Sequence, residues 1–277
     1  MSTLTAKGAG ARRRAVLVRQ SQLGDHEAPS PRPPLRPDPI LRYGRPGLLA
    51  LSSVMRVATN APVMSLTFDD GPNPEQTPGV LDALAAAGAR ATFFVLTDRA
   101  QAHPELIHRM LAEGHEVGLH GLDHARLTAV PGREALRRIR AGKRTLEGIT
   151  GRPVTLYRPT YGAIGLTALL GSRLAGMEVV IWTAWARDWF DAPVAELADR
   201  AVHALHPGAI VLLHDTTDDE EARAAGPLPT FARADVARRV LAGMAAGGLV
   251  SVPVGDLLAR YPAVRAVTAE LPRLPFR

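Results

Sequence analysis

The sequence predicts an α/β domain in which short parallel strands alternate with helices around a barrel-like sheet. From about residue 61 onward, short apolar runs alternate with helical stretches, as expected when crossover helices connect parallel strands. The chain has 277 residues, 46% of them hydrophobic, which is enough to bury the core of one large domain. It shows no internal repeat, so a solenoid is excluded.

Seven apolar runs have the length and composition of buried strands: residues 63–68, 91–96, 116–119, 154–157, 178–182, 209–213 and 249–252. Helices are predicted between them over residues 75–87, 104–113, 133–149, 194–205 and 230–246. Gly88, Gly114 and Gly248 lie where three of these helices are expected to end, because glycine readily adopts the left-handed conformation that terminates a helix.

The N-terminal part of the chain lacks this alternation. Residues 28–47 contain seven prolines, a composition that favours extended polyproline II and gives no apolar face with which to join a core. We therefore expect a disordered, basic, proline-rich arm over residues 1–47, a folded domain over residues 48–262 and a C-terminal tail over residues 263–277.

Charge and cysteine content exclude several functional classes. Residues 1–60 carry ten Lys or Arg and three Asp or Glu, so this part accounts for the formal net charge of +6 and the rest of the chain is close to neutral. A nucleic-acid-binding surface on the domain is therefore not expected. There are no cysteines, which excludes disulfides, thiolate metal sites and cysteine nucleophiles. Any metal must bind His, Asp or Glu.

Targeting segments are not evident in the sequence. The cluster Arg12-Arg13-Arg14 is followed by only four apolar residues before Arg19, too few for the apolar core of a secretory signal. The uncharged window 240–255 is too short and too rich in glycine to span a membrane. The sequence thus favours a cytoplasmic protein over a secreted one and predicts no membrane span; it does not indicate an oligomeric state.

Polar side chains follow the predicted strands. They are Asp69 and Asp70 after the first strand, His120 after the third, Arg158 after the fourth, Asp188 beyond the fifth and His214 after the sixth. Because the carboxyl ends of parallel strands in an α/β barrel meet on one face, where such enzymes build their active sites, we expect these side chains to form one site.

Asp70, His120 and His124 form the candidate metal site. Two histidines four residues apart direct both rings to one point if the segment forms a helical turn. A carboxylate from another strand end then completes a His₂Asp set with open positions, which suits a catalytic Zn²⁺ or another divalent cation. The other histidines lie in helices or at the turns entering strands, and structural roles are expected for them.

Asp69 is the candidate general base. Adjacent carboxylates in an extended segment point to opposite sides, so we expect Asp70 to bind the metal and Asp69 to take a proton from the metal-bound water. Gly71-Pro72 would form the tight turn that brings both carboxylates to the metal. Arg158 is the expected counter-charge that keeps Asp69 ionised. This arrangement argues against a glycosidase, in which two carboxyl groups face one another across a sugar.

His214 is the candidate general acid. It follows a very apolar run, and a nearby carboxylate such as Asp188 would hold its imidazole protonated, as a leaving group requires. Trp182, Trp185 and Trp189 fall within eight residues of one another. Such a cluster at the active face suits stacking against sugar rings or enclosing a small acyl group.

These motifs resemble the polysaccharide deacetylases of carbohydrate esterase family 4, the NodB-homology group. The resemblance covers roughly residues 56–260, and five motifs occur in the family's order. The matching segments are Thr67-Phe68-Asp69-Asp70-Gly71-Pro72, His120-Gly121-Leu122-Asp123-His124, Arg158-Pro159-Thr160-Tyr161-Gly162, Asp188-Trp189 and Leu212-Leu213-His214.

The resemblance implies a distorted (β/α)₇ barrel and a divalent metal, usually zinc, with Co²⁺ or another divalent ion as the alternative. It implies these roles: Asp69 as base, His214 as acid, Asp70, His120 and His124 as metal ligands, the backbone N–H of Tyr161 as an oxyanion donor, and Trp189 as a wall of the acyl pocket. Three positions depart from the family pattern: Gly121 replaces Ser or Thr, Thr160 replaces Pro, and Trp185 replaces the first Asp of the fourth motif. The first is expected to loosen the turn between the two histidines, and the other two to alter the walls of the substrate groove.

The predicted function is a metal-dependent hydrolase of carbon–nitrogen bonds other than peptide bonds. A metal-bound water would attack the N-acetyl carbonyl of an amino sugar in an oligosaccharide, a polysaccharide or a biosynthetic intermediate. The alternatives are an O-acetyl esterase or another C–N hydrolase on the same scaffold, and a sugar-binding pseudoenzyme. An acetylated carbohydrate is the expected partner in each case.

Overall fold

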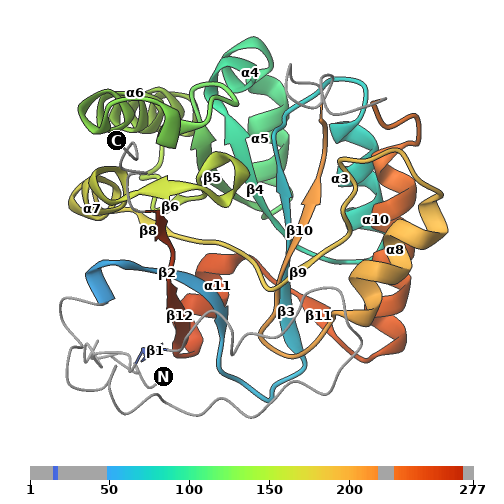
Figure 1. Cartoon of the computed structure of the whole chain (residues 1–277). Helices are drawn as coiled ribbons and strands as arrows, with labels where there is room; N and C mark the ends of the chain where they lie inside the picture. Colours follow the sequence, from blue (N-terminus) through green and yellow to red (C-terminus); the bar gives the residue numbers. More distant parts are fainter. Residues whose placement is uncertain (1–14, 18–48, 218–227, 271–277) are drawn as a thin grey trace, which may run out of the picture.

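Figure 1 shows the computed structural model of the chain, which describes residues 15–17, 49–217 and 228–270. Within these residues the central sheet has the order β8-β6-β5-β4-β3-β10-β9, and β11 also pairs with β3. Every neighbouring pair in this sheet is parallel. The strands are β3 (Val63–Asp69), β4 (Thr92–Leu96), β5 (Glu116–Gly121), β6 (Leu156–Tyr157), β8 (Glu178–Val179), β9 (Ala184–Trp185), β10 (Ile210–His214) and β11 (Val250–Ser251).

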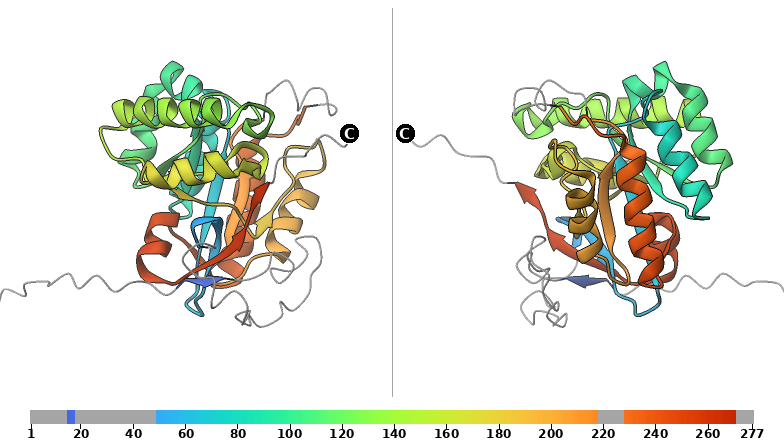
Figure 2. Two further views of the ribbon diagram at one scale, coloured as in Figure 1. Left: turned by 60° about the vertical axis from the view of Figure 1, so that its left-hand side comes forward. Right: turned by 90° about the vertical axis from the view of Figure 1, so that its right-hand side faces the viewer.

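Helices surround the outside of this curled sheet (Figure 1, Figure 2). The five predicted helices are present as α3 (Thr77–Ala86), α5 (Pro104–Ala112), α6 (Gly132–Thr150), α8 (Val194–His203) and α10 (Arg233–Ala246). Three more are α4 (Thr97–Ala102), α7 (Leu166–Leu174) and α11 (Val254–Arg260). The predicted α/β barrel class is therefore confirmed, as a sheet that curls without closing into a complete barrel.

Alternation along the strands gives the sheet two different faces. Leu66 and Phe68 of β3 belong to the large core cluster that packs beneath the helices. Thr67 and Asp69 alternate with them and both contact Arg158, on the inner side of the sheet. Because both faces are covered, the strands are apolar over most of their length, which is why they were recognisable as runs in the sequence.

The register between β3 and β10 places two site residues side by side. The two strands pair in parallel from Ile210 opposite Ser65 to His214 opposite Asp69. Residues paired in this way point to the same face of a sheet. Asp69 and His214 therefore emerge next to each other at the carboxyl edge.

A second, three-stranded sheet of order β1-β12-β2 lies beside the central one. Its strands are β1 (Val16–Leu17), β2 (Ser52–Val57) and β12 (Ala263–Val267), and β13 (Ala269–Glu270) pairs with β7 (Ile164–Gly165). Residues 263–270, which the sequence assigned to the tail, are thus strands, because Val264 and Ala266 alternate inward and pack on Met55. Residues 16–17 of the predicted arm pair with β12. The rest of the arm and tail lies outside the described residues.

Across the described part of the chain, no helix combines the length and the apolar character that crossing a membrane requires.

Candidate active site

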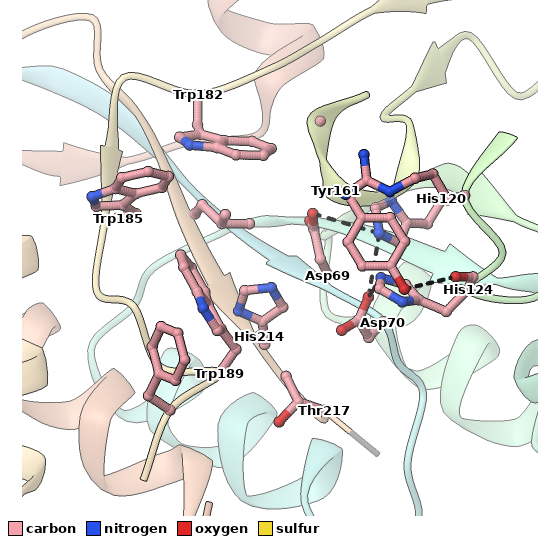
Figure 3. Close-up of a pocket in the computed structure, with 14 residues that line it drawn as sticks. Asp69, Asp70, His120, His124, Tyr161, Trp182, Trp185, Trp189, His214 and Thr217 are labelled. Atoms are coloured by element: carbon pink, nitrogen blue, oxygen red, sulfur yellow. Dashed lines mark hydrogen bonds and ion pairs between the residues drawn. The ribbon is translucent and has the colours of Figure 1, made fainter. Parts of the chain in front are cut away.

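A cavity of about 360 Å³ opens at the carboxyl ends of the central strands. Figure 3 shows the side chains that line it. Eight of the ten predicted site residues lie on its wall: Asp69, Asp70, His120, His124, Tyr161, Trp185, Trp189 and His214. The other two, Arg158 and Asp188, lie behind the wall and contact Asp69 and His214.

The three predicted metal ligands converge. Oδ1 of Asp70 lies 3.2 Å from Nε2 of His120 and 3.2 Å from Nε2 of His124. One ligand atom from each residue lies within 4.8 Å of the others, and this is the group among the described residues that has the composition of a metal site. Nδ1–H of His120 donates a hydrogen bond of 2.8 Å to the carbonyl of Arg158, so its Nε2 lone pair faces the site.

These residues fit a divalent cation. Oδ1 of Asp70 is buried and, among the described residues, has no hydrogen-bond partner of good geometry, although two imidazole nitrogens lie near it. Burial alone would raise the pKa of Asp70, but His120 and His124 hold it well below its usual range. An ionised oxygen facing two nitrogen atoms in this way is a donor set for a cation with open positions, such as Zn²⁺.

The two histidines converge without a helical turn, so that part of the expectation was wrong. His120 belongs to β5, which ends at Gly121, and His124 is the last of the three bend residues that follow. A Cβ on Gly121 would lie 2.6 Å from the carbonyl oxygen of Asp123. In this chain the bend therefore packs the Asp123 carbonyl directly against the glycine that departs from the family pattern.

Asp69 and Asp70 both face the cavity because the backbone is not extended at Asp70. Its φ is 77°, in the left-handed region that side-chain-bearing residues rarely adopt. The expected alternation therefore breaks after Asp69. Oδ2 of Asp69 lies 3.9 Å from Nε2 of His120, close to the oxygen of Asp70 that meets the same nitrogen.

Arg158 is the counter-ion of Asp69. Its Nη1 donates hydrogen bonds of 2.7 Å to Oδ1 of Asp69 and 2.7 Å to Oγ1 of Thr67. Its other nitrogens donate to the carbonyls of Val180 and Ile181. The guanidinium is fully buried; burial lowers its pKa, and the charge of Asp69 opposes that shift. The pair leaves Oδ2 of Asp69 directed toward the cavity.

Asp188 holds His214, which lies beside Asp69 at the end of the neighbouring strand. Its Oδ1 lies 2.8 Å from Nδ1 of the His214 ring. Burial lowers the pKa of His214, but attraction to Asp188, the hydrogen bond to it, and the charges of Asp70 and Asp69 raise it to about 9. The contact with Asp188 therefore favours the protonated form of the His214 ring.

Aromatic side chains form the remaining wall (Figure 3). The ring of Trp185 lies 6.2 Å from that of Trp182 and 5.5 Å from that of Trp189. Trp189 meets His214 edge-on at 5.6 Å. Phe190 continues the wall and is 49% exposed, so an apolar surface leads from solvent to His214.

Two residues that support the site were not predicted from the sequence. Arg233, at the start of α10, donates from Nη1 to the carbonyl of Asp188 and from Nη2 to Oγ1 of Thr217. Asp215 is buried beneath Gly71, and burial raises its pKa to about 6. Asp215 could have been found, since it follows His214 at a strand end; nothing in the sequence connects Arg233 with the site.

Comparison with known proteins agrees with this geometry. The family model for polysaccharide deacetylase matches residues 56–180. The chain is 39% identical over 172 residues to a chitooligosaccharide deacetylase of Sinorhizobium fredii, covering 62% of this chain and 80% of that protein. It is 40% identical over 168 residues to the peptidoglycan-N-acetylmuramic acid deacetylase PdaC of Bacillus subtilis, covering 61% of this chain but only 35% of PdaC.

The fold is shared as well. A solved structure of PdaC from Bacillus subtilis superimposes with a TM-score of 0.62 at 36% identity, covering 73% of this chain and 93% of that one. Sequence and fold agree: this chain belongs to the polysaccharide deacetylase family, carbohydrate esterase family 4, which carries the NodB homology domain.

Proposed function

We propose that the protein removes N-acetyl groups from amino sugars in an oligosaccharide, a polysaccharide or a biosynthetic intermediate, with a divalent cation held by Asp70, His120 and His124. One observation carries the proposal: Asp69 and His214, a base and an acid, line one cavity together with the cation ligands. The chitooligosaccharide and peptidoglycan deacetylases among its relatives support an amino-sugar substrate.

The base acts at the start of the reaction. Asp69 accepts a proton from the water that attacks the acetyl carbonyl carbon, and Arg158 holds its carboxylate in place through a contact of 2.7 Å. When bound, the divalent cation supplies Lewis-acid chemistry, which lowers the pKa of a coordinated water and stabilises charge on the carbonyl oxygen. Zn²⁺ suits the His₂Asp donor set, and Co²⁺ is the alternative.

The acid acts when the carbon–nitrogen bond breaks. His214 donates a proton to the departing amine nitrogen, so the products are acetate and a free amino sugar. Asp188 fixes the His214 ring through Nδ1, which leaves Nε2 as the donating atom. Asp69 thus takes one proton from the water, and His214, on the neighbouring strand, gives another to the amine.

The remaining residues position the substrate. Tyr161 has a φ of 59°, and its hydroxyl donates a hydrogen bond of 3.2 Å to the carbonyl of His124. Its backbone N–H is assigned to the oxyanion of the tetrahedral intermediate. Trp189 encloses the acetyl methyl group beside His214, and Trp185 extends the apolar wall toward the sugar.

Acetate release from a panel of substrates tests the proposal. The panel contains N-acetylglucosamine oligomers, an N-acetylmuramic-acid-containing glycan and an O-acetylated xylan, each assayed before chelation, after chelation and after addition of Zn²⁺ or Co²⁺. We expect release from an N-acetylated glycan that chelation abolishes and the metal restores. Release from the xylan alone would instead indicate an O-acetyl esterase, and glycan binding without release would indicate a pseudoenzyme.

A further inference from the structure

We propose that Asp215 is a positioning residue: it holds Asp70 in its left-handed backbone conformation and thereby sets the affinity of the site for its divalent cation. The inference rests on the cation site proposed above. It concerns a residue that lies outside the donor set, because both carboxylate oxygens of Asp215 are occupied by hydrogen bonds from the protein.

Asp215 forms hydrogen bonds with the backbone on both sides of Asp70. Its backbone N–H donates a hydrogen bond of 3.3 Å to the carbonyl of Asp69, the residue before Asp70. Its Oδ1 accepts a hydrogen bond of 2.9 Å from the backbone N–H of Gly71, the residue after it. One residue at the end of β10 therefore fixes the peptide groups on either side of the metal ligand.

The conformation of Asp70 needs such support. A residue with a side chain at φ 77° is strained, and the extended conformation that continues β3 would be favoured without restraint. In that conformation successive side chains alternate, so the Asp70 carboxylate would turn away from the face that Asp69 occupies. It would then leave the nitrogens of His120 and His124.

The second carboxylate oxygen anchors Asp215 itself. Oδ2 accepts a hydrogen bond of 2.6 Å from Oγ1 of Thr77, the first residue of α3. The same Oγ1 accepts a hydrogen bond of 2.8 Å from the backbone N–H of Asn73. The turn after Asp70 is thereby tied to the start of a helix as well as to β10.

The absence of a side chain at Gly71 makes room for the Asp215 carboxylate. A Cβ on Gly71 would lie 2.0 Å from Oδ2 and 2.4 Å from Oδ1 of Asp215. No side chain at position 71 is compatible with the carboxylate where it lies. The sequence assigned Gly71 to a tight turn; the structure adds that Asp215 packs directly against its Cα.

Two variants perturb this contact from opposite sides. Asp215→Ala removes the acceptor for the Gly71 N–H. Gly71→Ala displaces the Asp215 carboxylate but removes no ionisable residue from the chain. Asp215→Asn is the rescue variant, because its amide oxygen still accepts from Gly71 and its NH₂ group can donate to Thr77. Thr77→Val is a graded variant: it removes the hydrogen bond to Oδ2 of Asp215 and the one from the Asn73 N–H, but it leaves the acceptor for the Gly71 N–H in place.

The test measures Zn²⁺ affinity and local amide exchange on the full chain. The metal is removed by chelation and dialysis, Zn²⁺ is titrated against a chromophoric chelator, and hydrogen exchange at the Gly71 amide is followed in the metal-free protein. We expect Asp215→Ala and Gly71→Ala to weaken Zn²⁺ binding about 10- to 100-fold, the usual effect of losing a residue that orients a ligand, and to accelerate exchange at Gly71. Asp215→Asn should stay within about threefold of the wild type, and Thr77→Val should lie between Asp215→Asn and Asp215→Ala.

Different outcomes separate the two proposals. His120→Ala is included as a reference for the cation site itself. If His120→Ala loses Zn²⁺ while both Asp215→Ala and Gly71→Ala bind it like the wild type, the positioning role is wrong and the cation site stands. If the wild type and His120→Ala bind Zn²⁺ equally, the proposed cation site fails. Should Asp215→Ala not fold, Gly71→Ala and Asp215→Asn decide the question.

Discussion

Asp188 binds His214 through both of its carboxylate oxygens: Oδ1 lies 2.8 Å from Nδ1 of the ring, and Oδ2 accepts a hydrogen bond of 2.8 Å from the backbone N–H. Ring orientation and main-chain position are thus fixed by one buried group. Arg233 approaches the same carboxylate, with its Nη1 3.5 Å from Oδ2, and its positive charge partly compensates the negative charge of Asp188. The contact with Asp188 raises the pKa of His214 and so favours its charged form.

The pH dependence of catalysis should follow this pair. Activity is expected to persist through neutral pH and to fall at alkaline pH, where His214 loses the proton that Asp188 helps it to hold. Asp188→Asn removes the attraction that raises the pKa of His214, so the fall should move to lower pH. The dependence of kcat/KM on pH for both proteins is the measurement, and an unchanged basic limb in Asp188→Asn would contradict the assignment.

The raised pKa of His214 also makes the free energy of unfolding depend on pH. The pKa of His214 is about 9 in the folded protein and about 6.5 when exposed, so its protonation stabilises the fold fully below about pH 6.5, and this contribution is lost as pH rises through about 9. Urea unfolding at pH 6 and pH 10 measures the loss. His214→Gln should show a smaller difference between the two pH values than the wild type.

The cation ligands should be individually indispensable. Asp70→Ala, His120→Ala and His124→Ala are each expected to lower metal content and activity together, because three protein ligands leave none in reserve. Metal analysis of the purified variants, alongside acetate release, tests this. Full metal occupancy and full activity in one variant would remove that residue from the site.

Base and acid should differ in their dependence on the leaving group. Asp69→Asn keeps the shape of the side chain and should lower activity by about 10²–10⁴ on any acetylated substrate, because the attacking water loses its proton acceptor. His214→Ala should impair turnover of an N-acetyl sugar far more than that of an aryl acetate, whose leaving group departs as a stable anion. Equal losses on both substrates would show that His214 only positions the site.

The buried ion pair of Arg158 and Asp69 should matter to folding as well as to catalysis. Arg158→Met leaves the Asp69 carboxylate buried without its counter-ion and is expected to lower the free energy of unfolding by about 3–5 kcal/mol. Adding Asp69→Asn should recover part of this loss, since the amide carries no charge. Arg137→Met, which breaks an exposed pair with Glu134, is the control and should leave unfolding in urea unchanged.

Sequence reasoning succeeded where a local pattern determines the structure. The strands of a covered parallel sheet are apolar runs, and polar residues at their carboxyl ends stand out against them, as Asp69, His120 and His214 do. It missed β9 and β7, whose two residues each give no pattern. α4 was missed because it follows β4 without a break.

Inside the site, the unpredicted details arise from contacts between distant segments. The left-handed Asp70 is stabilised by a residue that lies 145 positions further along the chain, Asp215. The fold-back after His120 depends on how closely the carbonyl of Asp123 approaches Gly121. Neither contact follows from local propensity, which is why the ligand set was predictable while the backbone that presents it was not.

The ladder between β3 and β10 also governs how this enzyme scaffold can change over time. His214 and Asp69 are partners in that ladder, so hydrogen bonds between the two strands hold side by side the two residues that we propose as proton donor and proton acceptor. Insertions in the surrounding loops can reshape the groove for a new glycan without altering that spacing. A single-residue insertion within either strand would shift one partner to the opposite face and abolish the chemistry. Loop changes can therefore alter which substrate binds, while the strand register keeps the reacting groups in place.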